Sequence, residues 1–116
     1  MEQIDKGADT MIKNGRPYTF ENGAIDAGLI TDHTEQEIKR VYDWIEKNIR
    51  PRNTPMLERD SYNIKHILQR DTGIYLTNNE FKDAMLMCGY SPINPDETNW
   101  KYCISKRSPA FSRKKI

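Results

Sequence analysis

The chain has 116 residues, a length that suits one domain with a core of its own. Its longest apolar runs are only a few residues and its first residues contain no apolar signal segment, so we expect neither a signal peptide nor a membrane span, and a cytoplasmic protein. Two cysteines, Cys88 and Cys103, are too few for a disulfide-stapled secreted scaffold, and we expect buried free thiols.

Charge is distributed unevenly, although the net charge is only +1. Residues 98–116 carry six basic residues and no acid, whereas residues 1–97 carry 12 basic and 17 acidic residues. The six are Lys101, Lys106, Arg107, Arg113, Lys114 and Lys115. A basic arm on an acidic body commonly binds phosphate or an acidic protein surface. The alternative is a solubilising tail that folds back on its own acidic body.

Residues 1–33 are predicted to form an N-terminal arm or short helix that packs on the core. Four apolar residues share one face of a helix over 3–13, which Asn14-Gly15 would close. Residues 16–30 contain an Asn-Gly step and predict either a hairpin or an irregular arm.

The first clear helix spans residues 34–49. Thr34 and Glu37 are spaced as a capping box, and a continuous apolar stripe follows them. Trp44 lies off that stripe, either as a second core contact or as an exposed interface anchor. The helix ends before Pro51, and we expect a connector over 51–60.

The next helix is predicted over 61–72, with Asp60 or Ser61 as its cap. It runs into Asp71-Thr72-Gly73, the catalytic triplet of retroviral-type aspartic proteases. That chemistry needs the aspartate on a loop after a buried strand, so that two copies share a proton. Here an amphipathic pattern precedes Asp71, and Gly73 stands where a left-handed residue closes a helix. We therefore interpret the triplet as a helix end. Tyr75, in the turn that follows, is expected to cover the core.

A third helix is predicted over 77–88. Thr77 and Glu80 are spaced as a capping box, while Leu76 and Phe81 occupy the positions of a hydrophobic staple. After a turn-rich segment, Trp100, Tyr102 and Ile104 alternate with polar residues and predict a strand, with a short partner near 91–93.

This order predicts a mainly α fold with a small β-hairpin (α+β), with a winged-helix-like three-helix core over 34–105 and a basic C-terminal tail over 106–116. In a winged-helix domain the third helix enters the DNA major groove and the hairpin contacts the backbone. Three helices and a hairpin also describe many small domains that bind no nucleic acid.

The outward face of helix 77–88 is predicted to present Asn78, Asn79, Lys82, Asp83 and Leu86. The asparagines could read adenine edges, but Glu80 and Asp83 would repel phosphate. Binding would therefore depend on Lys101 and the basic tail, with Phe111 as a stacking or anchoring group. The candidate nucleic-acid or partner-binding residues are Asn78, Asn79, Lys82, Lys101, Lys106, Arg107, Arg113, Lys114 and Lys115.

The sequence contains no clear motif for metal binding, nucleotide binding or catalysis. His33, His66, Cys88 and Cys103 lack the paired spacing of a zinc site, and no glycine loop is followed by Lys-Ser/Thr. No set of residues combines nucleophile, base and oxyanion donor, so we expect no enzyme, no cofactor, no metal and no small-molecule substrate.

Residues 61–105 carry the pattern Ser61-Tyr62, Lys65-His66, Thr72-Gly73-Ile74-Tyr75, Asn78, Phe81-Lys82, Ala84-Met85, Gly89-Tyr90 and Asn99-Trp100. This pattern resembles a group of small uncharacterised proteins of phages, prophages and conjugative elements of Gram-positive bacteria. The resemblance implies a mobile-element accessory protein, a class that includes DNA-binding regulators and inhibitors of host defence such as anti-CRISPR proteins.

Together these observations predict a protein that acts by macromolecular binding. The leading hypothesis is association with DNA through the basic tail and the third helix. The alternative is an inhibitor that binds a host protein, such as a defence nuclease, because an acidic body can occupy a basic groove.

Overall fold

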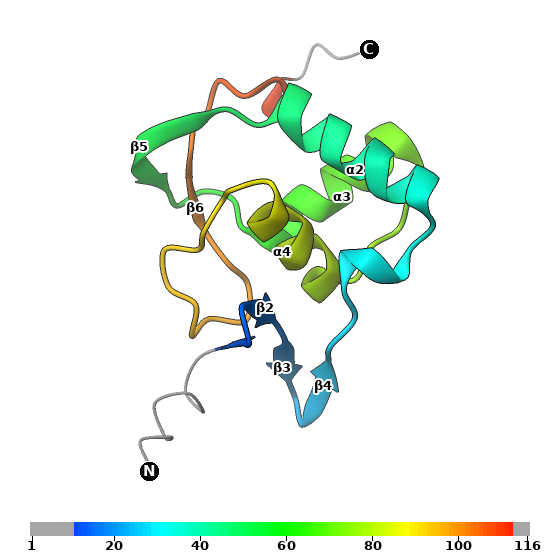
Figure 1. Ribbon diagram of the computed structural model, residues 1–116. Coiled ribbons are helices and arrows are strands. Elements are labelled where there is room, and N and C mark those ends of the chain that lie inside the picture. Colours follow the sequence, from blue (N-terminus) through cyan, green and yellow to red (C-terminus); the bar gives the residue numbers. More distant parts are fainter. Residues whose placement is uncertain (1–10, 113–116) are drawn as a thin grey trace.

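A computed structural model describes residues 11–112 (Figure 1). The chain forms an α+β domain with three helices and small two-stranded antiparallel sheets in this range. The helices are α2 (Glu35–Asn48), α3 (Ser61–Thr72) and α4 (Asn78–Met87). None of the helices in the described part of the chain has the length and apolar character to cross a bilayer.

The ends of the helices follow the predicted caps. The Thr34 hydroxyl accepts a hydrogen bond from the Glu37 amide at the start of α2, and Asp60 and Asn63 form a capping box at the start of α3. At α4, Thr77 and Glu80 form the predicted capping box. Gly73 closes α3 at φ 80°, a left-handed conformation that glycine adopts without strain.

The predicted strand after α4 is present, but its predicted partner is wrong. Strand β6 (Tyr102–Ile104) pairs with β5 (Pro51–Met56), which lies between α2 and α3, and not with residues 91–93. Pro51 faces Ile104 and Met56 faces Tyr102, with an irregular register between them. Residues 91–93 contact the segment before β6 through one bond, from the Ile93 amide to the Lys101 carbonyl at 2.9 Å.

The described part of the N-terminal arm consists of two hairpins and a 3-10 turn. Strands β1 (Ile12–Lys13) and β2 (Arg16–Pro17) form the first hairpin, and β3 (Thr19–Glu21) and β4 (Ala24–Asp26) form the second; η1 (Ile30–Asp32) then leads into α2. Asn22 and Gly23 connect β3 to β4 with φ 53° and 80°, as a type I′ turn requires.

The hairpin alternative for residues 16–30 is therefore confirmed. The helix predicted over 3–13 lies mostly outside the described residues, and its last two residues are in β1.

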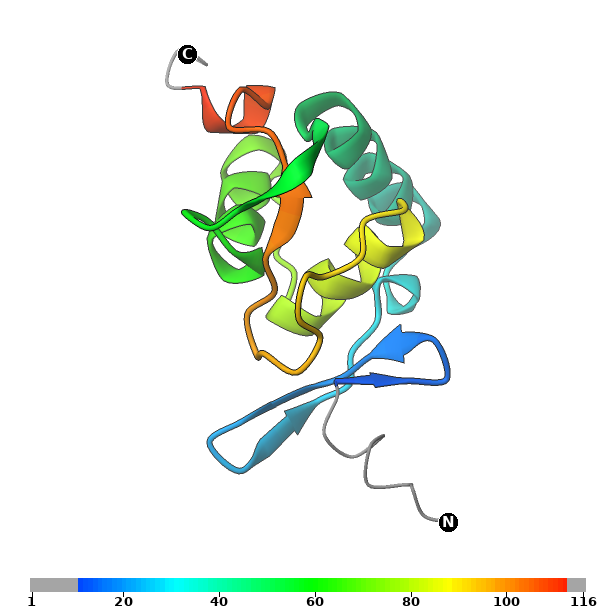
Figure 2. The ribbon, with the colours of Figure 1, turned by 90° about the vertical axis from the view of Figure 1, so that its left-hand side faces the viewer.

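The core lies between the three helices and strand β6. Its largest fully buried side chains include Trp100, Tyr102 and Phe81. Trp44 is only 6% exposed, so it is a core contact and not an exposed anchor. The segment after β6 also packs against the body, because Ser108 and Ala110 are buried around the 3-10 turn η2 (Pro109–Phe111). Figure 2 shows the two N-terminal hairpins at one end of the molecule and η2 at the other.

Candidate functional site

The outward face of α4 is covered by the N-terminal arm, residues 11–32. Asn79, Lys82 and Asp83 are 0% exposed, so the expectation that they face outward is wrong. Figures 1 and 2 show the hairpins beneath α4, on the side away from α2. A helix with this polar face is buried only because the arm supplies a matching polar partner for each side chain.

Asp83 is bound by a bidentate ion pair with Arg16. The Arg16 Nε and Nη2 atoms each donate to the carboxylate at 2.7 Å, and the Ile30 amide donates to it at 3.0 Å. The hydrogen bond to Asp83 raises the pKa of the Arg16 guanidinium. The pair fixes the first hairpin and η1 on the same side of α4.

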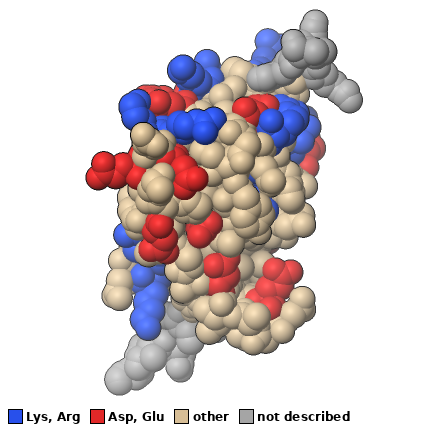
Figure 3. Space-filling model, turned by 90° about the vertical axis from the view of Figure 1, so that its right-hand side faces the viewer, with Lys and Arg blue, Asp and Glu red and all other residues tan. Residues whose placement is uncertain are grey.

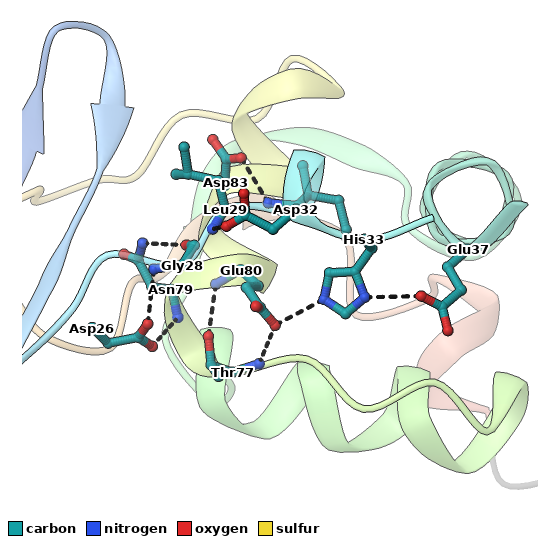
Figure 4. Close-up of polar contacts among 11 residues, drawn as sticks. Asp26, Gly28, Leu29, Asp32, His33, Glu37, Thr77, Asn79, Glu80 and Asp83 are labelled. Carbon is teal, nitrogen blue, oxygen red and sulfur yellow. Dashed lines mark hydrogen bonds and ion pairs between the residues drawn. The ribbon is translucent and has the colours of Figure 1, made fainter. Parts of the chain in front are cut away.

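Asn79 uses its amide to bind the backbone of the arm (Figure 4). Its Nδ2 donates to the Pro17 carbonyl at 3.0 Å and to the Gly28 carbonyl at 2.7 Å, and its Oδ1 accepts from the Thr19 hydroxyl at 2.8 Å. Both amide hydrogens are therefore committed, and neither is free to read an adenine edge in this arrangement.

Lys82 is fully buried and forms no ion pair with a carboxylate among residues 11–112. Its Nζ donates to the Thr19 hydroxyl at 2.9 Å and the Thr98 carbonyl at 3.0 Å, and lies 4.5 Å from the Trp100 ring centroid. Burial lowers the pKa of Lys82 to about 8. The ammonium thus joins the arm, α4 and the loop before β6, and does not face a phosphate backbone.

Asn78 has a similar structural role on the other side of the helix start. Its Nδ2 donates to the Asn99 Oδ1 at 2.8 Å and to the Thr98 carbonyl at 3.2 Å, while its Oδ1 accepts from the Ser61 hydroxyl at 2.7 Å. These bonds connect the first turns of α3 and α4 to the segment before β6.

His33 links the segment after η1 to two helices, as Figure 4 shows. Its Nε2 lies 3.0 Å from Glu80 of α4 and its Nδ1 lies 3.1 Å from Glu37 of α2. Desolvation acts to lower the pKa of His33, but the hydrogen bonds to the two carboxylates outweigh it and raise that pKa. Sequence analysis did not identify this bridge. His33 and Glu37 are only four residues apart, but Glu80 lies 47 residues beyond His33.

The predicted basic residues do not form one cluster with the α4 residues. Lys106 pairs with Glu58 at 2.9 Å, both side chains being well exposed, Arg107 is exposed, and Lys101 is half-buried just before β6. Arg113, Lys114 and Lys115 lie outside the described residues. In Figure 3, basic side chains lie mainly in the upper part of the visible face, with acidic ones among them and a further basic group at the lower left. Acidic side chains also spread over the middle and lower part of this face.

Beside the start of η2, the structure forms a hollow of about 390 Å³ that sequence analysis missed. Arg59 and Arg70 line it together with Phe111, and no Asp or Glu is among its lining residues. The Arg59 guanidinium lies 4.7 Å from the Phe111 ring centroid and makes no ion pair with a described residue. We call Arg59, Arg70, Lys106, Arg107 and Phe111 the basic end.

Asp71 occupies the last turn of α3, as predicted. Its Oδ2 accepts a hydrogen bond from the Trp44 indole at 2.9 Å, and its Oδ1 accepts from Arg70 at 2.9 Å. The carboxylate therefore fixes a core tryptophan of α2. Tyr75 is 56% exposed, so the expectation that it covers the core is wrong.

The cysteines are free and half-buried, and burial raises the pKa of the Cys88 thiol to about 11. Across residues 11–112 no group of His, Cys, Asp and Glu side chains is arranged to hold a metal ion.

Comparison with known proteins gives no match to a family model, a curated protein or a solved structure.

Proposed function

We propose that this chain is a winged-helix-like accessory protein of a mobile element that binds nucleic acid through its basic end, without catalysis. The order α2, β5, α3, α4, β6, with β5 paired to β6, supports the winged-helix-like arrangement. In this proposal α4 has a structural role and is not the recognition helix that contacts DNA bases, because the arm covers its outward face.

The observation that carries the proposal is the acid-free hollow of the basic end. The Arg59 guanidinium makes no ion pair with a described residue and matches phosphate oxygens, and Phe111 presents a ring beside it. Arg70 donates its Nε to Asp71, and its two Nη groups remain as further donors. In the sequence, Ser112 is followed directly by Arg113-Lys114-Lys115, three further basic residues. Such a concentration of cations favours the phosphate backbone over base edges, so we expect binding with little sequence preference.

The test is fluorescence anisotropy of a labelled 20-base-pair DNA duplex titrated with the full chain at several salt concentrations. About 3–5 phosphate contacts would give a log–log salt slope of roughly −3 to −4.5, since each neutralised phosphate releases about 0.9 counterion. Deletion of residues 113–116 together with Arg59→Met should weaken binding strongly and make the slope shallower. A deletion that began at residue 106 would also remove the buried Ser108 and Ala110, and would confuse binding with folding.

The matched control is Lys39→Met, which removes an exposed positive charge on α2 that pairs with Asp43. It should leave affinity and slope nearly unchanged. Full duplex affinity in the combined tail and Arg59 variant, or no binding even at low salt, would overturn the proposal.

The second candidate, a protein-binding inhibitor of a host factor, is favoured by a different observation. Phe20, Ile25, Tyr62 and Tyr75 are large apolar or aromatic side chains that are 48–65% exposed, and residues of this kind anchor protein interfaces. Capture of a host protein that survives nuclease treatment and depends on these side chains would support this role.

A further inference from the structure

A groove of about 610 Å³ separates the β3–β4 hairpin from the start of α3 and the turn before α4. Tyr62, Lys65, His66 and Tyr75 line its helical side, and residues of β3 and β4 line the other. The groove is distinct from the basic end, because the two share no lining residue.

Lys65 is the unusual residue of this groove. It is only 4% exposed, and its Nζ lies 5.2 Å from the Tyr62 ring centroid and 4.8 Å from the Tyr75 ring centroid. No hydrogen-bond acceptor or carboxylate binds this ammonium among the described residues, and burial lowers the pKa of Lys65. The Lys65 Nζ is not fully enclosed, because Tyr102 Oη is the only buried side-chain N or O atom without a hydrogen-bond partner among the described residues. A largely buried ammonium that is open to the groove and lacks an acceptor would be stabilised by a ligand that supplied a carboxylate.

The two tyrosines form a pre-arranged aromatic wall around Lys65. Tyr62 is 49% exposed and Tyr75 is 56% exposed. The His66 ring packs edge-on against Tyr62 with centroids 4.7 Å apart, which restricts the orientation of both rings. Exposed aromatic rings that are already fixed provide contact area at little cost in side-chain entropy.

The opposite side of the groove follows the outer edge of β4. The lining residues Thr19, Glu21, Ala24 and Asp26 are paired across the two strands and share one face of the hairpin. Ile25 belongs to the opposite face, so a groove that also contacts Ile25 extends from that face to the outer edge of β4. In the described residues β4 pairs only with β3, so its outer edge can accept a further strand.

We propose that this groove docks an extended segment of a protein partner, which pairs with the free edge of β4 and places an acidic side chain on Lys65 between Tyr62 and Tyr75. The charges of the groove favour a protein segment over a nucleic acid. Glu21 and Asp26 line the same groove and would repel a phosphodiester backbone, whereas Lys65 is its only Lys or Arg.

The test selects peptides from a phage-displayed library of random 12-residue sequences on the full-length chain, and measures the affinity of the selected peptides by fluorescence anisotropy. The selected peptides should share an Asp or Glu. Tyr62→Ala and Tyr75→Ala should each weaken binding at least tenfold. Leu57→Ala and Ile93→Ala, which truncate exposed apolar residues outside the groove, should leave binding unchanged.

The contact with Lys65 has its own measurement, because Lys65→Met keeps the buried stem and removes the charge. Replacing the shared acid of the peptide by its amide should weaken binding to the parent at least tenfold and have little effect on binding to Lys65→Met. Thermal melts check that each variant is folded, and the Arg59→Met variant of the basic end should bind the peptides as the parent does.

Two results would overturn the proposal. One is that the selected peptides bind the Tyr62→Ala and Tyr75→Ala variants with the same affinity as the parent, or that the acid-to-amide change in the peptide weakens binding to the parent and to Lys65→Met equally. The other is failure to select any peptide whose binding depends on the groove. In that case, binding of a labelled single-stranded dT oligonucleotide that requires Tyr62 and Tyr75 would show that the groove binds nucleic acid instead.

Discussion

Replacing Arg16 by methionine tests whether the N-terminal arm is an integral part of the domain. The substitution leaves the Asp83 carboxylate, whose side chain is 0% exposed, with only the Ile30 amide among its described donors. Removal of one member of a buried ion pair costs about 3–5 kcal/mol. Because the Arg16 side chain is itself 32% exposed, water can enter where the guanidinium was, and we expect roughly 3 kcal/mol.

The assay is urea unfolding followed by the fluorescence of the buried residues Trp44 and Trp100. Asp83→Asn in the Arg16→Met background removes the unpaired charge, so the double variant should be more stable than the sum of the single effects predicts, by about 1–3 kcal/mol. Lys13→Met, which changes the exposed residue opposite Arg16 in β1, should stay within about 0.5 kcal/mol of the parent. Additive effects of the two single variants, or a cost of Arg16→Met no larger than that of Lys13→Met, would refute the reasoning.

Three further predictions concern α4, the histidine bridge and the end of α3. Phe81→Ala should cost about 3–5 kcal/mol through a core cavity, and Thr77→Ala about 1 kcal/mol through the lost cap; melting temperatures equal to that of the parent would contradict the observed start of α4. The raised pKa of His33 means that its bridge stabilises the fold fully below the unfolded-state pKa of about 6.5, and that this stability is lost as pH rises through the folded-state value. Unfolding measured across this pH range should show the loss in the parent and not in His33→Gln. Asp71→Asn should cost no more than about 1 kcal/mol, because the amide oxygen can still accept the Trp44 indole and the Arg70 side chain is 53% exposed, so water can solvate its charge; peptide cleavage abolished by this variant would mean that the triplet is catalytic after all.

The helices were predictable because their signals are local. Thr34, Asp60 and Thr77 each cap the helix that their spacing indicates, and Gly73 closes α3 in the expected left-handed conformation. In each case the residues that define the helix end are less than one helix length apart. Local propensity and tertiary structure agree at these positions, so no knowledge of distant contacts was needed.

Strand β5 was not predictable in the same way. Its sequence, Pro-Arg-Asn-Thr-Pro-Met, contains two prolines and buries only its last residue, so it lacks the alternation that marks a half-buried strand. Its pairing with β6 is defined by a partner about fifty residues away in the chain. The predicted partner near 91–93 is closer to β6 in sequence, but it is joined to the segment before β6 by the bond from the Ile93 amide to the Lys101 carbonyl and forms no strand with β6.

The buried polar face of α4 could not be predicted from periodicity either. Asn79, Lys82 and Asp83 form a polar stripe that, by pattern alone, belongs on the surface. Their burial depends on Arg16 and Thr19, more than fifty residues earlier in the chain, whose side chains and backbone supply the hydrogen bonds. The local periodicity of polar and apolar residues contains no information about such a distant partner. The aromatic groove and the basic end were missed for the same reason.

The distance in sequence between the arm and α4 also sets an order of events during protein synthesis. Arg16 and Asp83 are 67 residues apart, and at about 5–20 residues per second the arm is made several seconds before its partner helix. During that interval the hairpins lack the buried ion pair and the Asn79 and Lys82 contacts that fix them. Until α4 is made, the polar groups of the arm that later bind its buried face are therefore without these partners.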